Sequence, residues 1–78
     1  MPDDELQVVE SKKYSYELIT SMSYDDWMKE SIDQLFRSFE YSEYDFLLST
    51  RSTRRKEAHG HEKIETQISF HMIIHTHI

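Results

Sequence analysis

The fold is decided by residues 64–78, which read IETQISFHMIIHTHI. Every second residue of this stretch, beginning with Ile64, is apolar or threonine, and the residues between them are mostly polar. Successive side chains of a β-strand point to opposite faces, so the alternation predicts one long strand with a continuous apolar face. Such a strand needs a layer packed against it, and the rest of the chain must supply that layer.

A helix and two further strands precede it. Alternating residues predict strands over about 14–21 and 44–53, and Leu6 to Val9 is either an early extension of the first or a separate short strand. Between the two strands, Ser23 can cap a helix by accepting a hydrogen bond from the amide of Asp26. Apolar residues then recur at steps of three and four, so we expect one amphipathic helix that ends near residues 39–41.

The single glycine of the chain, Gly60, lies between the last two strands and predicts a hairpin turn. The expected fold is therefore α+β: a two-layer sandwich in β-α-β-β order, with one amphipathic helix on an antiparallel sheet and a long C-terminal hairpin. We expect residues 1–78 to form one small domain, with residues 1–5 as a disordered tail.

Composition narrows the classes of function. The 78 residues include no cysteine, so neither a disulfide nor a thiolate zinc site can stabilise the small core. The net charge of −6 makes nucleic acid an unlikely partner. We find no long apolar run and no basic leader at the acidic N-terminus, and we therefore expect no membrane contact and a cytoplasmic location.

The lengths of the expected elements do not match. A strand of fifteen residues spans about 50 Å, whereas a helix of seventeen residues spans about 25 Å. The helix would leave apolar strand surface uncovered, and a second copy is the simplest cover. We therefore expect a homo-oligomer, a dimer or larger, with Ile64, Thr76 and Ile78 at its interface. A bend or frayed ends in the strand, or a cover supplied by another protein, are the alternatives.

Two groups of residues are candidates for contacts with another protein. The first is acidic and aromatic: Tyr24, Tyr41, Glu43 and Tyr44. Tyrosine is enriched at interface hot spots, and the neighbouring acids suit a basic partner. The second is basic, Arg51, Arg54 and Arg55, and suits an acidic surface, which a second copy could provide. The alternative for the tyrosines is a place at the rim of the core with the hydroxyl in water, and the alternative for the arginines is contact with nucleic-acid phosphate.

No pattern indicates catalysis or a bound metal or cofactor. The sequence has neither a nucleophile elbow nor a glycine-rich loop, so we expect a protein that is not an enzyme. His71, His75 and His77 share one face of the last strand, but no acid is fixed beside them by the sequence. We interpret them as part of a polar, solvated face.

The order strand, helix, strand, strand resembles the dodecin family. Residues 14–27 are compatible with that family's first strand and helix start, and the segment QISFHM, residues 67–72, is similar in pattern to its last strand. The resemblance implies a shell of twelve subunits that holds flavin between them, with Gln67 as a flavin contact. The chain departs from the family at Tyr44 and Phe46, where dodecins carry the tryptophan on which flavin stacks.

The function that we expect is a non-enzymatic, acidic protein-binding module that self-associates and occupies the surface of a partner protein. It would be of inhibitor or adaptor type, by analogy with small acidic proteins that viruses and mobile elements encode. The alternative, which depends on the resemblance, is a dodecin-like oligomeric flavin-binding protein.

Overall fold

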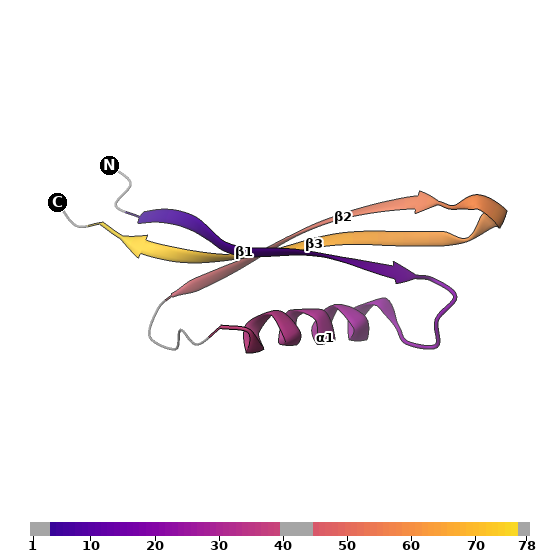
Figure 1. Cartoon of the computed structure of the whole chain (residues 1–78), viewed down its shortest axis with the longest axis horizontal. Coiled ribbons are helices and arrows are strands. Elements are labelled where there is room, and N and C mark those ends of the chain that lie inside the picture. Colours follow the sequence, from indigo (N-terminus) through magenta and orange to yellow (C-terminus); the bar gives the residue numbers. More distant parts are fainter. Residues whose placement is uncertain (1–3, 40–44, 77–78) are drawn as a thin grey trace.

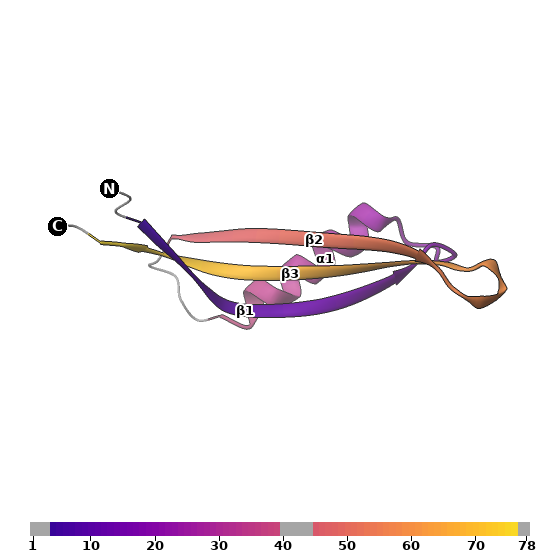
Figure 2. The same ribbon diagram turned by 90° about the horizontal axis from the view of Figure 1, so that it is seen from above.

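The computed structural model describes residues 4–39 and 45–76. It has one helix packed on a three-stranded antiparallel sheet, in the order β1 (Asp4–Glu17), α1 (Tyr24–Arg37), β2 (Phe46–Lys56) and β3 (Glu62–His75) (Figure 1). The strand order in the sheet is β1-β3-β2, so the C-terminal strand lies in the centre (Figure 2). The α+β fold expected from the sequence, with its C-terminal hairpin, is thus confirmed.

Local sequence explains where the helix begins and ends. The amide of Asp26 donates a hydrogen bond to the hydroxyl of Ser23 at 3.2 Å, which is the predicted N-terminal cap. The helix ends at Arg37, slightly earlier than expected, and both the amide and the hydroxyl of Ser38 donate to the carbonyl of Leu35, at 3.2 and 2.6 Å. A serine thus closes the helix without the glycine that commonly ends helices.

The β2–β3 hairpin turns at residues 57–61, where the lone glycine predicted it. His59 and Gly60 both have left-handed backbones, with φ of 69° and 82°. The amide of Glu57 donates to the carbonyl of His61 and closes the turn. Glycine adopts a positive φ without steric cost, which accounts for its place here.

The apolar face of β3 forms the core with the helix. Phe70 is 1% exposed and is surrounded by the rings of Phe36, Phe39 and Phe46, whose centroids lie 4.3 to 4.9 Å from its own. Ile68 on β3 is fully buried beside it. We call the sheet face that carries these residues the inner face, because α1 packs on it.

The first strand is longer than the sequence predicted. It begins at Asp4, inside the segment expected to be a tail, and ends at Glu17. Leu6 to Val9 is therefore an extension of this strand and not a separate one. The pairing with β3 shifts by one residue between Val8 and Glu10, so Val9 is an extra residue, a β-bulge.

The length mismatch is present in the fold. The fourteen residues of α1 span about 21 Å, and the fourteen residues of β3 span about 46 Å. The molecule is a long thin slab, 57 × 25 × 15 Å, and the sheet extends past both ends of the helix (Figure 1). No helix within the described residues is long and apolar enough to cross a membrane.

Candidate functional site

The described residues place no second layer over the sheet face that points away from α1, which we call the outer face (Figure 1). On β3 it carries the residues that alternate with the buried ones, from Lys63 to His75. The paired residues of β1 and β2 lie on the same face, since directly opposed residues of antiparallel strands share a side. The two halves of this face differ chemically.

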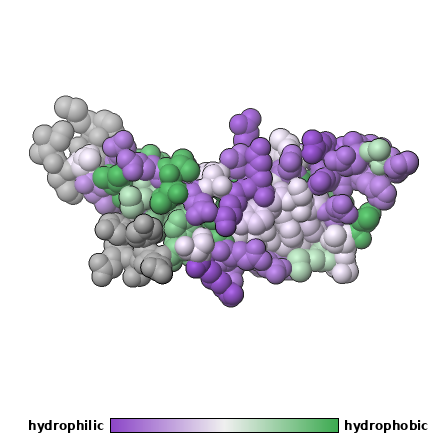
Figure 3. Space-filling view, in the orientation of Figure 1, coloured by the Kyte–Doolittle hydropathy of each residue, from purple (hydrophilic) through white to green (hydrophobic). Residues whose placement is uncertain are grey.

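The half near the chain termini is apolar. Leu6, Val8 and Leu47 are 52%, 59% and 48% exposed, and they flank Ile73 and His71 on β3. We call Leu6, Val8, Leu47 and Ile73 the apolar patch. Figure 3 shows hydrophobic residues gathered at the end of the molecule where β1 begins and β3 ends. Exposed apolar residues that adjoin one another, unlike isolated ones, are typical of contact surfaces.

The bulge at Val9 creates the patch. Val9 turns inward and packs against the core, whereas Val8 before it pairs with His71 on the outer face. An extra residue exchanges the faces of every residue on one side of it. Leu6 and Val8 therefore point outward. Tyr14 and Tyr16 are also at even-numbered positions of β1, but they lie beyond the bulge and point toward the helix.

His75 connects all three strands at the margin of the patch. Its Nδ1 lies 2.9 Å from Oδ1 of Asp4 on β1, and its Nε2 lies 3.0 Å from Oδ2 of Asp45, just before β2. The hydrogen bond with Asp45, followed by that with Asp4, raises the pKa of His75 above its ordinary value. Both ring nitrogens can donate at once only in the imidazolium form, so the bridge is complete when His75 is protonated.

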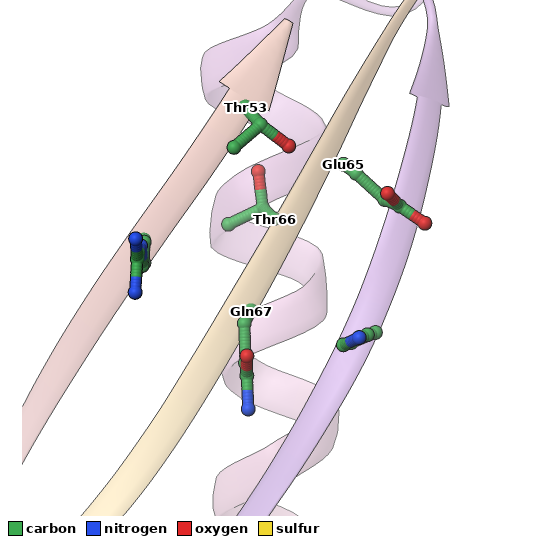
Figure 4. Close-up of a pocket in the computed structure, with 6 residues that line it drawn as sticks. Thr53, Glu65, Thr66 and Gln67 are labelled. Carbon is green, nitrogen blue, oxygen red and sulfur yellow. The ribbon is translucent and has the colours of Figure 1, made fainter.

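The half near the hairpin is polar and mainly basic. A row of three serines, Ser11, Ser69 and Ser49, separates it from the apolar patch. Beyond this serine row, Lys13, Gln67 and Arg51 lie side by side across the three strands, since both Lys13 and Arg51 pair with Gln67. They line a shallow hollow of about 190 Å³, which we call the basic hollow. Its other lining residues are Thr53, Glu65 and Thr66 (Figure 4).

The predicted acidic and aromatic group is only partly within the described residues. Tyr24 is half-buried: its ring packs against Tyr16 and Trp27, and its hydroxyl bonds to the hydroxyls of Ser52 and Thr66, both at 3.0 Å. Tyr24 thus joins the helix start to the inner face of the sheet, and its contact with a partner protein remains a prediction. Three further candidates, Tyr41, Glu43 and Tyr44, lie outside the described residues.

The basic group is divided between the two faces. Arg54 pairs with Ile64 on the inner side and lies 3.8 Å from Glu62. Arg55 is on the outer face, 3.3 Å from Glu57 and 3.6 Å from Glu65. Arg51 shares the outer face with Arg55, but only Arg51 belongs to the basic hollow.

The expected interface residues also lie in different surroundings. Ile64 is 9% exposed in the single chain and so offers little surface to a second copy. Thr76 is exposed just after β3, and Ile78 lies outside the described residues. Gln67, named by the dodecin resemblance, is exposed in the basic hollow, where its amide donates to the hydroxyl of Ser11 at 2.8 Å.

Sequence reasoning missed Leu6, Val8, Leu47 and Lys13. Leu47 could have been found, since it is apolar at a polar position of the alternation in β2. Within the described residues, no three histidine or acidic side chains gather as metal ligands would. No family model, no curated protein and no solved structure matches this chain. The resemblance to dodecins therefore gains no support from these comparisons and remains a prediction.

Proposed function

We propose that the protein is a non-enzymatic binding module that self-associates through the apolar patch and occupies the surface of a partner protein. The observation that carries the proposal is the apolar half of the uncovered outer face. Val8 and Leu6 are each more than half exposed there, on a sheet whose opposite face is covered by a helix. An antiparallel sheet with a helix on one face commonly carries polar residues on its other face. Here only the half of the outer face near the hairpin is polar.

A second copy is the occupant that we propose for the face, because it would bring an identical apolar patch to the contact. The sheet face measures about 57 by 15 Å, because the 25 Å extent of the molecule runs from the sheet to the helix (Figures 1 and 2). Half of that area is roughly 430 Å², below the 600 Å² or so per partner that separates weak interfaces from standard ones, so we expect a weak dimer. Two such sheets can pack face to face about 10 Å apart, as in β-sandwiches. The apolar patch would then supply the dry centre of the contact.

The surface left free by such a dimer is the exposed side of α1. Its exposed charged residues include four acids, Asp25, Asp26, Glu30 and Asp33, and two bases, Lys29 and Arg37. Arg37 is already paired with Asp33 at 2.8 Å, so the face stays negative. An acidic helix favours a basic protein surface, which supports a partner of that charge.

The mass of the native particle tests the proposal. Sedimentation equilibrium of the full chain should give a mass of two chains or more at moderate salt. Hydrogen exchange measured above and below the association range should show added protection in β1 before the bulge and at the start of β2. A particle of one chain's mass at every concentration would refute self-association. A yellow particle that keeps bound flavin would instead favour the dodecin-like alternative.

A further inference from the structure

We propose that the basic hollow binds a phosphate monoester, held between Lys13 and Arg51. The two residues lie on either side of Gln67, one on each outer strand. Neighbouring strands are about 4.8 Å apart, so the backbones of Lys13 and Arg51 are separated by roughly 10 Å. Both side chains are long enough to lean over Gln67 and reach one small anion between them. This inference is independent of self-association, because the hollow lies beyond the serine row.

The charges at the hollow are arranged for an anion. Among the described residues, no acid lies within ion-pair distance of Lys13 or Arg51. The one acid in the lining, Glu65, would repel an anion, but Arg55 lies 3.6 Å from it and offsets its charge. Two cations without partners are therefore left facing a hollow in a chain of net charge −6.

The geometry fits a phosphate monoester in particular. A monoester carries nearly two negative charges at pH 7, which matches the two free cations. The planar guanidinium of Arg51 can donate two parallel hydrogen bonds to phosphate oxygens, and the ammonium of Lys13 can approach from the other side. The hydroxyl of Thr53, which points into the hollow in Figure 4, supplies a further donor.

Nucleic acid fits the same hollow less well. Single-stranded nucleic acid is usually held by aromatic rings on which the bases stack. Beyond the serine row, the outer face of the described strands carries no aromatic residue. Nearly all the aromatic rings of the described strands and helix belong to clusters on the inner face, around Trp27 and Phe70. The hollow can therefore hold a phosphate but has no ring on which to stack a base.

Titration of the full chain with phosphate, followed by amide NMR signals, tests the inference. Inorganic phosphate should move the signals of Lys13, Arg51 and Gln67 and should saturate. The substitution Arg51→Gln should weaken binding at least about tenfold, since it removes a charged, bidentate donor. The matched control is Arg54→Gln, three residues along the same strand on the inner side, which should bind phosphate as the wild type does.

Two comparisons sharpen the result. A phosphoserine peptide that binds more tightly than free phosphate identifies a protein-borne ligand, whereas equal affinities identify a small phosphorylated molecule. The phosphoserine peptide should bind better at pH 7.5 than at pH 5.5, since the second pKa of a phosphate monoester is about 6, whereas the binding of sulfate should not improve. Unsaturable shifts at every basic residue, or wild-type affinity in Arg51→Gln, would overturn the inference. Tighter binding of oligouridylate than of the phosphopeptide would also overturn it.

Discussion

Replacing Leu6 by aspartate is the sharpest test of the apolar patch. Leu6 lies on the outer face opposite Ile73 and is 52% exposed, so the substitution leaves the core around Phe70 intact. We expect the variant to fold with nearly the same thermal stability as the wild type. We also expect it to lose self-association, because the interface would then have to desolvate a carboxylate.

The size of the effect follows from the exposed fraction of the side chain. Complete burial of a leucine is worth about 1.5–3 kcal/mol, and half of the Leu6 side chain remains to be buried. Each copy therefore contributes about 1 kcal/mol, and a symmetric dimer contains two such residues, which gives about 2 kcal/mol. Losing that amount raises the dissociation constant of the dimer roughly 30-fold, and burial of the charge adds to it.

Sedimentation velocity over a wide range of concentration measures the change. The control is Ile19→Asp, which places the same charge on another exposed side chain, 67% exposed, in the connection between β1 and α1. This connection lies at the hairpin end of the sheet, where the amide of Leu18 donates to the carbonyl of Glu62. We expect Ile19→Asp to associate as the wild type does.

Two results would refute the reasoning. If Leu6→Asp and Ile19→Asp weakened association equally, net charge rather than the apolar patch would govern it. If Leu6→Asp folded normally and kept the dissociation constant of the wild type, the apolar patch would not lie in the interface. Circular dichroism and thermal melting of each variant show whether a loss of association comes from unfolding.

Three further predictions concern the fold itself. Phe70→Ala should cost about 3–5 kcal/mol in the free energy of unfolding, measured by urea denaturation, because a fully buried ring is removed. Thr66→Val should cost about 1–3 kcal/mol in the same assay, since its buried hydroxyl is shared by those of Tyr24 and Ser52. The pKa of His75, measured by NMR titration, should lie above 6.5, and Asp45→Asn should lower it. Because the pKa is raised in the folded state, His75 adds stability that is fully present below pH 6.5 and is lost as the pH rises through the folded-state pKa.

Much of the fold could be predicted because single elements carried their own signals. The alternation of β3 fixed which of its side chains would be buried, and Ile68 and Phe70 are buried as that pattern requires. The capping serine of the helix lies at Ser23, as predicted. Both signals are local: a strand's alternation and a cap's hydrogen bond each depend on residues only a few positions apart.

The candidate site was less predictable, because its residues meet only through strand pairing. Lys13 and Arg51 are 38 positions apart in the chain, and each becomes a neighbour of Gln67 through its own register with β3. The surroundings of Tyr24 were hard to predict for a related reason. A tyrosine in the first turn of a helix can be exposed, and only the partners Ser52 and Thr66, from two strands, make it part of the inner layer.

The bulge marks the limit of what alternation can predict. Leu6 and Val8 have the same parity as Tyr14 and Tyr16, so an unbroken strand would direct all four toward the helix. The segment Leu6 to Val9 has apolar residues at even positions, Leu6 and Val8, and at an odd position, Val9. The sequence alone therefore does not show which of these side chains are buried. Packing decides it: Val9 joins the inner cluster beside Phe70, and the extra residue directs Leu6 and Val8 to the uncovered face. The apolar patch, which most favours self-association, thus exists because Val9 points toward the helix.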